Sequence, residues 1–356
     1  MSYGIRVWGP NGKQFIDPLY LGVTCAGMYT IPDGQTQTLH FPNIPFGELR
    51  VLYVGQMGHD AAFVNISGYA GITFTPRHTG ILSPRLPRDS RIAAFARTTI
   101  EPSYGFMAIS DAGERLVSTI YPVPEFVGKV TFGPAPGSVT NLGNGNLLHE
   151  YSYVVPGWGA GRNRIILYSL PSLDGNFWFK GSTNVVSGTT GDYTLRLSLI
   201  ATNPIPVPLP EAYIFATDGH VQSADTYGLR VWDGQGRVLF DSGKYHMAAR
   251  DSMSGIAFPA ANGPQQFDYY SPTLASLSTP LVLLPTYSLH TFTPIQNQNS
   301  SVYRHSQGFL RRVGGTLSTR VFQIEQSTED SASNASYRYG SISDNSTFVV
   351  DGSLYN

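Results

Sequence analysis

A fifteen-residue phrase near the beginning of the chain, Tyr3–Asp17, recurs as Tyr227–Asp241. Tyrosine, glycine, arginine, valine, tryptophan, the last glycine of a turn and a closing aspartate occupy the same offsets in both copies. A looser copy spans Tyr104–Ser118, and a degenerate fourth runs from Tyr339 to Asp351. The copies start at residues 3, 104, 227 and 339, an interval far longer than the roughly 20–50 residues of solenoid repeats. The repeat therefore predicts a string of related domains.

Each copy of the phrase predicts a short β-hairpin. In the copy at 227–241, two apolar runs flank a four-residue turn, Asp233–Gly236. The equivalent turns, Gly9–Gly12 and Ser110–Gly113, also end in glycine, the residue that adopts a left-handed conformation at least cost. This pattern favours a type I turn followed by a one-residue bulge. We assign nine residues to the structural hairpins: Tyr3, Gly4, Gly12, Tyr104, Gly105, Gly113, Tyr227, Gly228 and Gly236.

The rest of the chain is rich in strand and turn signals. Charged residues make up 13% of the 356 residues, about half the roughly 25% usual for soluble domains, while glycine (38) and proline (25) are abundant. Apolar residues alternate with polar ones in Tyr193–Leu199, as expected for a half-buried strand. The apolar runs at 91–97 and 211–217 each precede a hairpin, and we interpret both as buried strands rather than helices. The predicted fold class is all-β, with tandem β-sandwich domains, Ig-like or jelly-roll-like, each ending in a Tyr-Gly hairpin.

The order of the predicted strands defines three domains. Two segments each show six elements in the same order, five strands and then the hairpin at Tyr104 or Tyr227, and this indicates two homologous sandwiches. The remaining segment matches less well and is interpreted as a divergent copy. The predicted domains are residues 1–122, 123–248 and 249–356.

Charge and cysteine content exclude several classes of function. A net charge of −1 without clustered Lys and Arg does not favour nucleic-acid binding. The single cysteine, Cys25, excludes an internal disulfide framework and is predicted to be a packed thiol. We expect no secretory signal and no membrane insertion, because the N-terminus lacks a basic region followed by an apolar one, and prolines interrupt the most apolar stretch.

Motifs for chemistry are weak. The eight histidines form no His-x-His or His-x3-His pair, no nucleophile elbow is present, and we predict no catalytic residue, no metal site and no cofactor. Gly157–Gly161 has the spacing of a dinucleotide loop, but a predicted strand follows it rather than a helix. Trp158 is then an aromatic residue at a hairpin tip. It is a candidate loop contact together with three tyrosines, Tyr69, Tyr269 and Tyr270, although such residues can equally anchor their own loops.

The phrase Tyr227–Ser242, with the apolar strand Ala212–Ala216 before it, resembles one that recurs in tail-tip and tail-fibre structural proteins of long-tailed bacteriophages of Gram-negative bacteria, including Pseudomonas phages. The specific match covers residues 212–245, with echoes at 1–17 and 91–118. The resemblance implies a virion structural protein that is assembled in the host cytoplasm, and it transfers no catalytic residue to this chain.

The expected function is that of a non-enzymatic virion component of the tail tip, baseplate or tail fibre, with a role in assembly and host attachment. The expected partners are other phage tail proteins, further copies of the chain in a trimer or another symmetric ring, and a host surface receptor. We place the N-terminal domain towards the rest of the virion and the C-terminal domain outward. Two alternatives remain open, namely a carbohydrate-binding adhesin or lectin, and a polysaccharide depolymerase.

Overall fold

The structure is a computed structural model. The residues that it describes are 7–8, 14–16, 21–32, 34–54, 59–76, 90–99, 108–109, 115–118, 120–155, 163–185, 193–202, 208–217, 223–224, 228–259, 265–284, 288–295, 300–329, 335–339 and 345–355.

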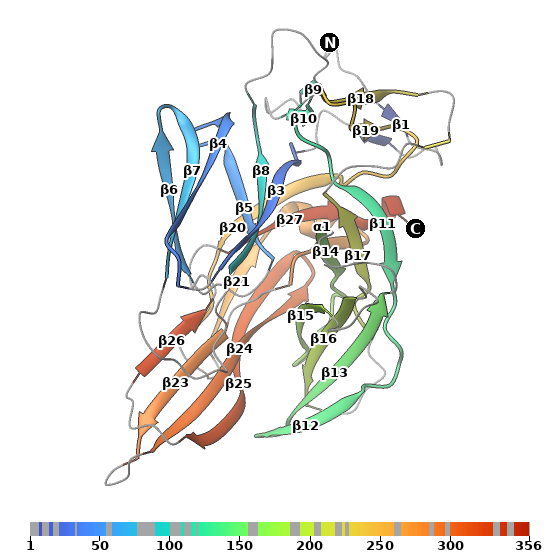
Figure 1. Cartoon of the computed structure of the whole chain (residues 1–356). Coiled ribbons are helices and arrows are strands. Elements are labelled where there is room, and N and C mark those ends of the chain that lie inside the picture. Colours follow the sequence, from blue (N-terminus) through green and yellow to red (C-terminus); the bar gives the residue numbers. More distant parts are fainter. Residues whose placement is uncertain are drawn as a thin grey trace.

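Nearly all regular structure in these residues is β-strand, which confirms the predicted all-β class (Figure 1). The only helices in the described part of the chain are the short α1 (Pro272–Ser276) and a final 3-10 turn, Gly352–Tyr355. The strands expected at 193–199, 164–168 and 177–180 are present, and both apolar runs interpreted as buried strands are strands as well.

The first repeat is a sandwich of two three-stranded antiparallel sheets. One sheet has the order β3-β8-β5 and the other β4-β7-β6. Its strands are β3 (Thr24–Ile31), β4 (Gln37–Pro45), β5 (Leu49–Tyr53), β6 (His59–Ile66), β7 (Tyr69–Pro76) and β8 (Ser90–Ala96).

The second repeat has the same connectivity. Its strands are β11 (Glu125–Val130), β12 (Ser138–Gly143), β13 (Asn146–Val155), β14 (Arg164–Ser169), β15 (Trp178–Val185), β16 (Tyr193–Ala201) and β17 (Ala212–Ala216). The order β11-β17-β14 reproduces β3-β8-β5, and β13-β16-β15 reproduces β4-β7-β6, with β12 as an added edge strand.

The third repeat keeps the same plan despite its divergent sequence. Its strands are β20 (Ala249–Ile256), β21 (Gln266–Tyr270), β22 (Pro280–Val282), β23 (Ser288–Pro294), β24 (Ser301–Val313), β25 (Thr316–Glu329), β26 (Ala335–Tyr339) and β27 (Asn345–Asp351). The order β20-β27-β22 again reproduces β3-β8-β5, and β21-β25-β24 reproduces β4-β7-β6. The strands β23 and β26 are additions that extend the second sheet.

The second and third repeats share both of their sheets, where the sequence suggested separate sandwiches. β14 pairs with β22 in a six-stranded sheet of order β11-β17-β14-β22-β27-β20. β15 pairs with β24, and this pairing joins the second sheet of the second repeat to the second sheet of the third repeat in one nine-stranded sheet. Both sheets therefore continue across the predicted boundary at 248/249. Strand order alone does not reveal this, because any edge strand can offer its unpaired N–H and C=O groups to a neighbour.

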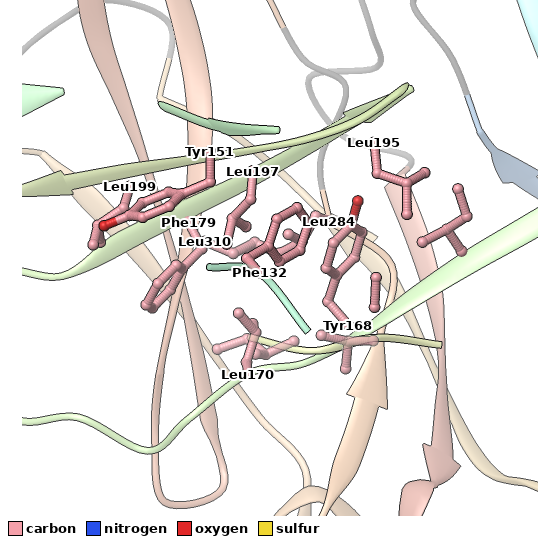
Figure 2. Packing of buried hydrophobic residues seen from close by; sticks show 14 of the residues in the cluster. Phe132, Tyr151, Tyr168, Leu170, Phe179, Leu195, Leu197, Leu199, Leu284 and Leu310 are labelled. Carbon is pink, nitrogen blue, oxygen red and sulfur yellow. The ribbon is translucent and has the colours of Figure 1, made fainter. Parts of the chain in front are cut away.

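Four β layers result, with a core in each gap between them. One core, around Phe41 and Phe74, lies between the two sheets of the first repeat. A second core lies between the sheet β3-β8-β5 and the six-stranded sheet, where Phe95 meets Phe348 with ring centroids 5.0 Å apart. The third core, between the six-stranded and nine-stranded sheets, contains Phe179 and Leu310 (Figure 2).

Strands in the middle layers are buried on both faces, and their sequences show it. Along β17, Tyr213 and Phe215 point into the second core, while Ala212 and Ile214 point into the third. Because successive side chains of a strand point to opposite faces, such a strand needs apolar residues at every position. This explains why the run at 211–217 lacks the alternation of a half-buried strand.

Three further pairs of strands are the predicted hairpins. They are β1 (Val7–Trp8) with β2 (Gln14–Ile16), β9 (Ala108–Ile109) with β10 (Arg115–Val117), and β18 (Arg230–Trp232) with β19 (Val238–Asp241). The prediction of a degenerate fourth hairpin at Tyr339–Asp351 is wrong, because β26 pairs with β23 whereas β27 pairs with β20 and β22. Residues 345–351 are instead the counterpart of β8 and β17, the strands that precede the hairpins in the earlier repeats.

Candidate functional site

The turn of the hairpin β18–β19 has the predicted type. The Gly236 N–H donates to the Asp233 carbonyl at 3.0 Å, and the φ of Gly236 is +77°. The Asp233 carboxylate also accepts the N–H groups of Gln235 and Arg237, at 2.9 and 2.8 Å. The register shifts by one residue opposite Val231 and Trp232, so that Leu239 is skipped and forms a bulge in β19. Together these features define a type I turn with a left-handed glycine and a bulge.

A buried ion pair explains why arginine and aspartate recur in the phrase. Arg230 Nε donates to Asp241 Oδ2 at 3.0 Å, and the Asp241 side chain is only 2% exposed. The same carboxylate accepts the backbone N–H groups of Ser223 and Gly243, at 2.8 and 2.9 Å. Burial on its own raises the pKa of Asp241, but these hydrogen bonds and those from the Ser223 hydroxyl and Arg230 outweigh it, so the pKa is lowered.

Gly228 has a steric role in the same hairpin. Its φ is +138°, and a Cβ at this position would collide with the Ser242 hydroxyl oxygen. That hydroxyl oxygen accepts the Leu229 N–H at 2.9 Å. Glycine in the Tyr-Gly pair therefore lets the chain pass close to the serine that follows Asp241.

The strands of the three hairpins pair in the same register. In the third hairpin Val231 lies opposite Phe240 and Trp232 opposite Val238, so one residue is skipped. The other two hairpins pair at the equivalent positions and also skip one residue. The corresponding pairs are Val7 with Ile16, Trp8 with Gln14, Ala108 with Val117 and Ile109 with Arg115.

Seven of the nine assigned hairpin residues lie outside the described residues: Tyr3, Gly4, Gly12, Tyr104, Gly105, Gly113 and Tyr227.

The second copy of the phrase has lost the ion pair on both sides. Met107 stands at the position of Arg230 and Ser118 at the position of Asp241. The Ser118 hydroxyl oxygen accepts the Ile120 N–H at 2.9 Å, as the Asp241 carboxylate accepts that of Gly243. The second copy therefore keeps the hydrogen bond from the backbone N–H two residues further on, but not the carboxylate that accepts it in the third hairpin.

The second and third hairpins pack against the body of the protein. Leu116 and Val117 of β10 and Val231 and Phe240 of the third hairpin belong to the second core. The His246 ring stacks on Phe240 with centroids 4.4 Å apart. The end of the chain is tied to the same region, since the Tyr355 hydroxyl donates to the His246 carbonyl at 2.8 Å.

The aromatic residues proposed as loop contacts do not form one surface. Trp158 lies outside the described residues. Tyr69 begins β7 and is half-buried, with the centroid of its ring 6.3 Å from that of His40. The Tyr269 hydroxyl accepts the Ala257 N–H at 2.7 Å, so this ring is an anchor, whereas Tyr270 on the opposite face of β21 is 70% exposed.

The seam between the second and third repeats is a site that sequence reasoning missed. Phe179 lies opposite Leu310 where β15 meets β24. On the other face of the nine-stranded sheet, Trp178 is 1% exposed and packs against Phe322, which in turn contacts Phe309. Trp178 comes from the second repeat and both phenylalanines from the third. The seam therefore has an apolar core of its own.

Two arginines of β24 close the seam. The buried Arg312 donates to the carbonyls of Leu170 and Leu274, at 3.1 and 3.4 Å, which belong to different repeats. Arg311 donates to the Gly175 carbonyl at 2.8 Å, and its guanidinium lies 4.8 Å from the centre of the Trp178 ring. Planar guanidinium groups can stack on aromatic faces while donating in the ring plane, and this geometry uses both properties.

Lys180 is an unusual residue beside the seam. It is 6% exposed, and it lies in a cross-strand row with Ser198 and Glu150. Burial lowers the pKa of Lys180 to about 7, an effect that the nearby Glu150 partly opposes.

We expect Lys180→Met to raise the free energy of unfolding at pH 7 by about 1–3 kcal/mol, because an apolar chain removes the cost of burying an ammonium group. In the wild type the unfolded chain holds this proton up to about pH 10.5 and the folded chain only to about pH 7. Lys180 therefore makes stability rise with pH between these values. Urea unfolding of the wild type and Lys180→Met at pH 7 and pH 9.5 measures the effect, and the difference in their free energies of unfolding should be smaller at pH 9.5. A difference that does not change with pH would contradict the lowered pKa of Lys180.

The described part of the chain contains no group of three or more His, Cys, Asp or Glu side chains close enough to hold a metal ion. It also contains no helix long and apolar enough to cross a bilayer. No protein-family model matches the chain, and no curated protein or solved structure was found to match it.

Proposed function

We propose that the protein is a structural component of a bacteriophage tail, in the tail tip, baseplate or tail fibre. There it assembles with other tail proteins and further copies of itself and takes part in attachment to the host surface. The observation that carries this proposal is the hairpin Tyr227–Ser242, whose phrase resembles one recurring in such proteins. The residues of that phrase form a buried ion pair and a close glycine–serine contact.

The layered architecture supports a mechanical rather than a catalytic role. The sheet β3-β8-β5 and the six-stranded and nine-stranded sheets stack through continuous cores, and the seam joins two repeats through hydrogen bonds and aromatic packing. A body of this kind holds fixed distances between its surfaces. Symmetric assembly then multiplies weak contacts with a receptor into avidity.

The test is to locate the protein in particles. Antibodies against the purified chain are applied to gradient-purified phage particles from the host that carries the gene, followed by electron microscopy and mass spectrometry. We expect labelling at the distal end of the tail, with a tag at the C-terminus farther from the capsid than one at the N-terminus. Absence of the protein from infectious particles would refute the proposed role.

A further inference from the structure

The outer edge of the first repeat corresponds to the edge that the other two repeats use to join each other. β15 and β24 occupy the same place in their repeats as β6 does in the first. β15 and β24 pair with one another at the seam, whereas β6 ends its sheet within the described residues. Figure 1 shows β6 on the outer side of the first repeat, away from the seam.

Phe63 marks the equivalent point on this edge. It is the fourth residue before the two-residue turn Ser67–Gly68, as Leu310 is before the turn Gly314–Gly315. Its cross-strand partner Ile72 is buried in the core of the first repeat. The side chain of Phe63 therefore lies on the core side of the sheet, yet it is 56% exposed, whereas Leu310 is 2% exposed because the neighbouring repeat closes the seam.

The composition of β6 favours pairing with another strand, because the strand lacks the residues that usually prevent it. Ala61–Val64 is apolar, and the strand contains no Lys, Arg or Pro, the residues that commonly block exposed edges. Its one charged residue, Asp60, lies near the start. Antiparallel pairing of two such strands about Phe63 places Asp60 opposite Ile66, so no like charges face each other.

We propose that β6 is a self-association edge that pairs antiparallel with β6 of a second copy of this chain. Phe63 lies opposite Phe63 of that copy, on a two-fold axis, as Phe179 lies opposite Leu310 within the chain. The result is a continuous six-stranded sheet across two molecules and an isologous dimer. The proposal follows from the internal repeat and does not depend on the proposed virion role.

Cysteine cross-linking of the full chain tests the register directly. The single native cysteine, Cys25, is buried, so Phe63→Cys introduces the accessible thiol. Directly opposed residues of an antiparallel pair have Cα atoms about 4.5–5.5 Å apart, within the range that a disulfide spans. Under mild oxidation we expect Phe63→Cys to form a covalent dimer. Val139→Cys should not, although Val139 is 52% exposed on another edge strand, β12.

Mass photometry of the uncross-linked proteins gives the second measurement. Wild-type protein should show dimers or multiples of them, and Phe63→Lys should weaken association about tenfold or more, with an unchanged circular dichroism spectrum. A wild type that is monomeric at every concentration would overturn the proposal. So would an oligomer that cross-links through Val139→Cys but not through Phe63→Cys, and so would a monomer that instead binds a strand of a different protein at β6.

Discussion

Replacement of Trp178 by alanine should lower the free energy of unfolding of the joined second and third repeats by about 3–5 kcal/mol. Trp178 is 1% exposed, and its ring contacts Phe322 from the third repeat. Its Nε1–H donates to Asn176 at 2.6 Å, and Arg311 covers its outer face. Removing the ring leaves a cavity at the seam and takes the stacking surface from Arg311.

The strands that lose protection in Trp178→Ala show whether the seam couples the two repeats, which the total loss of stability does not. If the seam joins the repeats into one cooperative unit, hydrogen exchange in Trp178→Ala should accelerate in β24 as well as in β15. A matched control is Phe74→Ala, an equally buried aromatic residue in the core of the first repeat. It should leave exchange in β24 unchanged. Faster exchange in β15 alone would show that the two repeats are only loosely attached.

Much of this fold could be predicted from the sequence, because it depends on local patterns. The strand Tyr193–Leu199 shows an alternation that fixes its faces, and Asp233–Gly236 has the residues that a bulged type I turn requires. The recurrence of these elements in the same order predicted repeats, and the three repeats have the same strand order in their sheets. The degenerate phrase at 339–351 misled, because the apolar run that suggested the second strand of a hairpin is equally what a buried strand such as β27 requires.

The seam could not be predicted, since it depends on which edges meet. Phe177–Lys180 indicated a strand, but the period of two does not show whether its neighbour lies in the same repeat or in the next. The buried Lys180 and Arg312 also gave no signal, because long charged side chains usually mark solvent-facing positions.

The recurring hairpin supplies the second large effect: Asp241→Ser should cost about 3 kcal/mol of unfolding free energy at pH 7. The substitution leaves Arg230, whose side chain is 18% exposed, without its carboxylate. It also takes an acceptor from the Ser223 N–H. Chemical denaturation at pH 7 measures the loss, with Arg237→Met as a control because the side chain of Arg237 is 67% exposed.

The second copy of the phrase suggests the compensating change. Arg230→Met combined with Asp241→Ser reproduces Met107 and Ser118, and this double variant should be more stable than Asp241→Ser alone because no buried charge is left unpaired. pH gives an independent check. The pKa of Asp241 is lowered on folding, so its contribution is present above the unfolded value of 3.8 and is lost as the pH falls through the folded value. The difference in stability between the wild type and Asp241→Ser should therefore shrink below pH 3.8. A difference that stays constant with pH, or a double variant no more stable than Asp241→Ser, would show that packing rather than charge accounts for the effect of this pair.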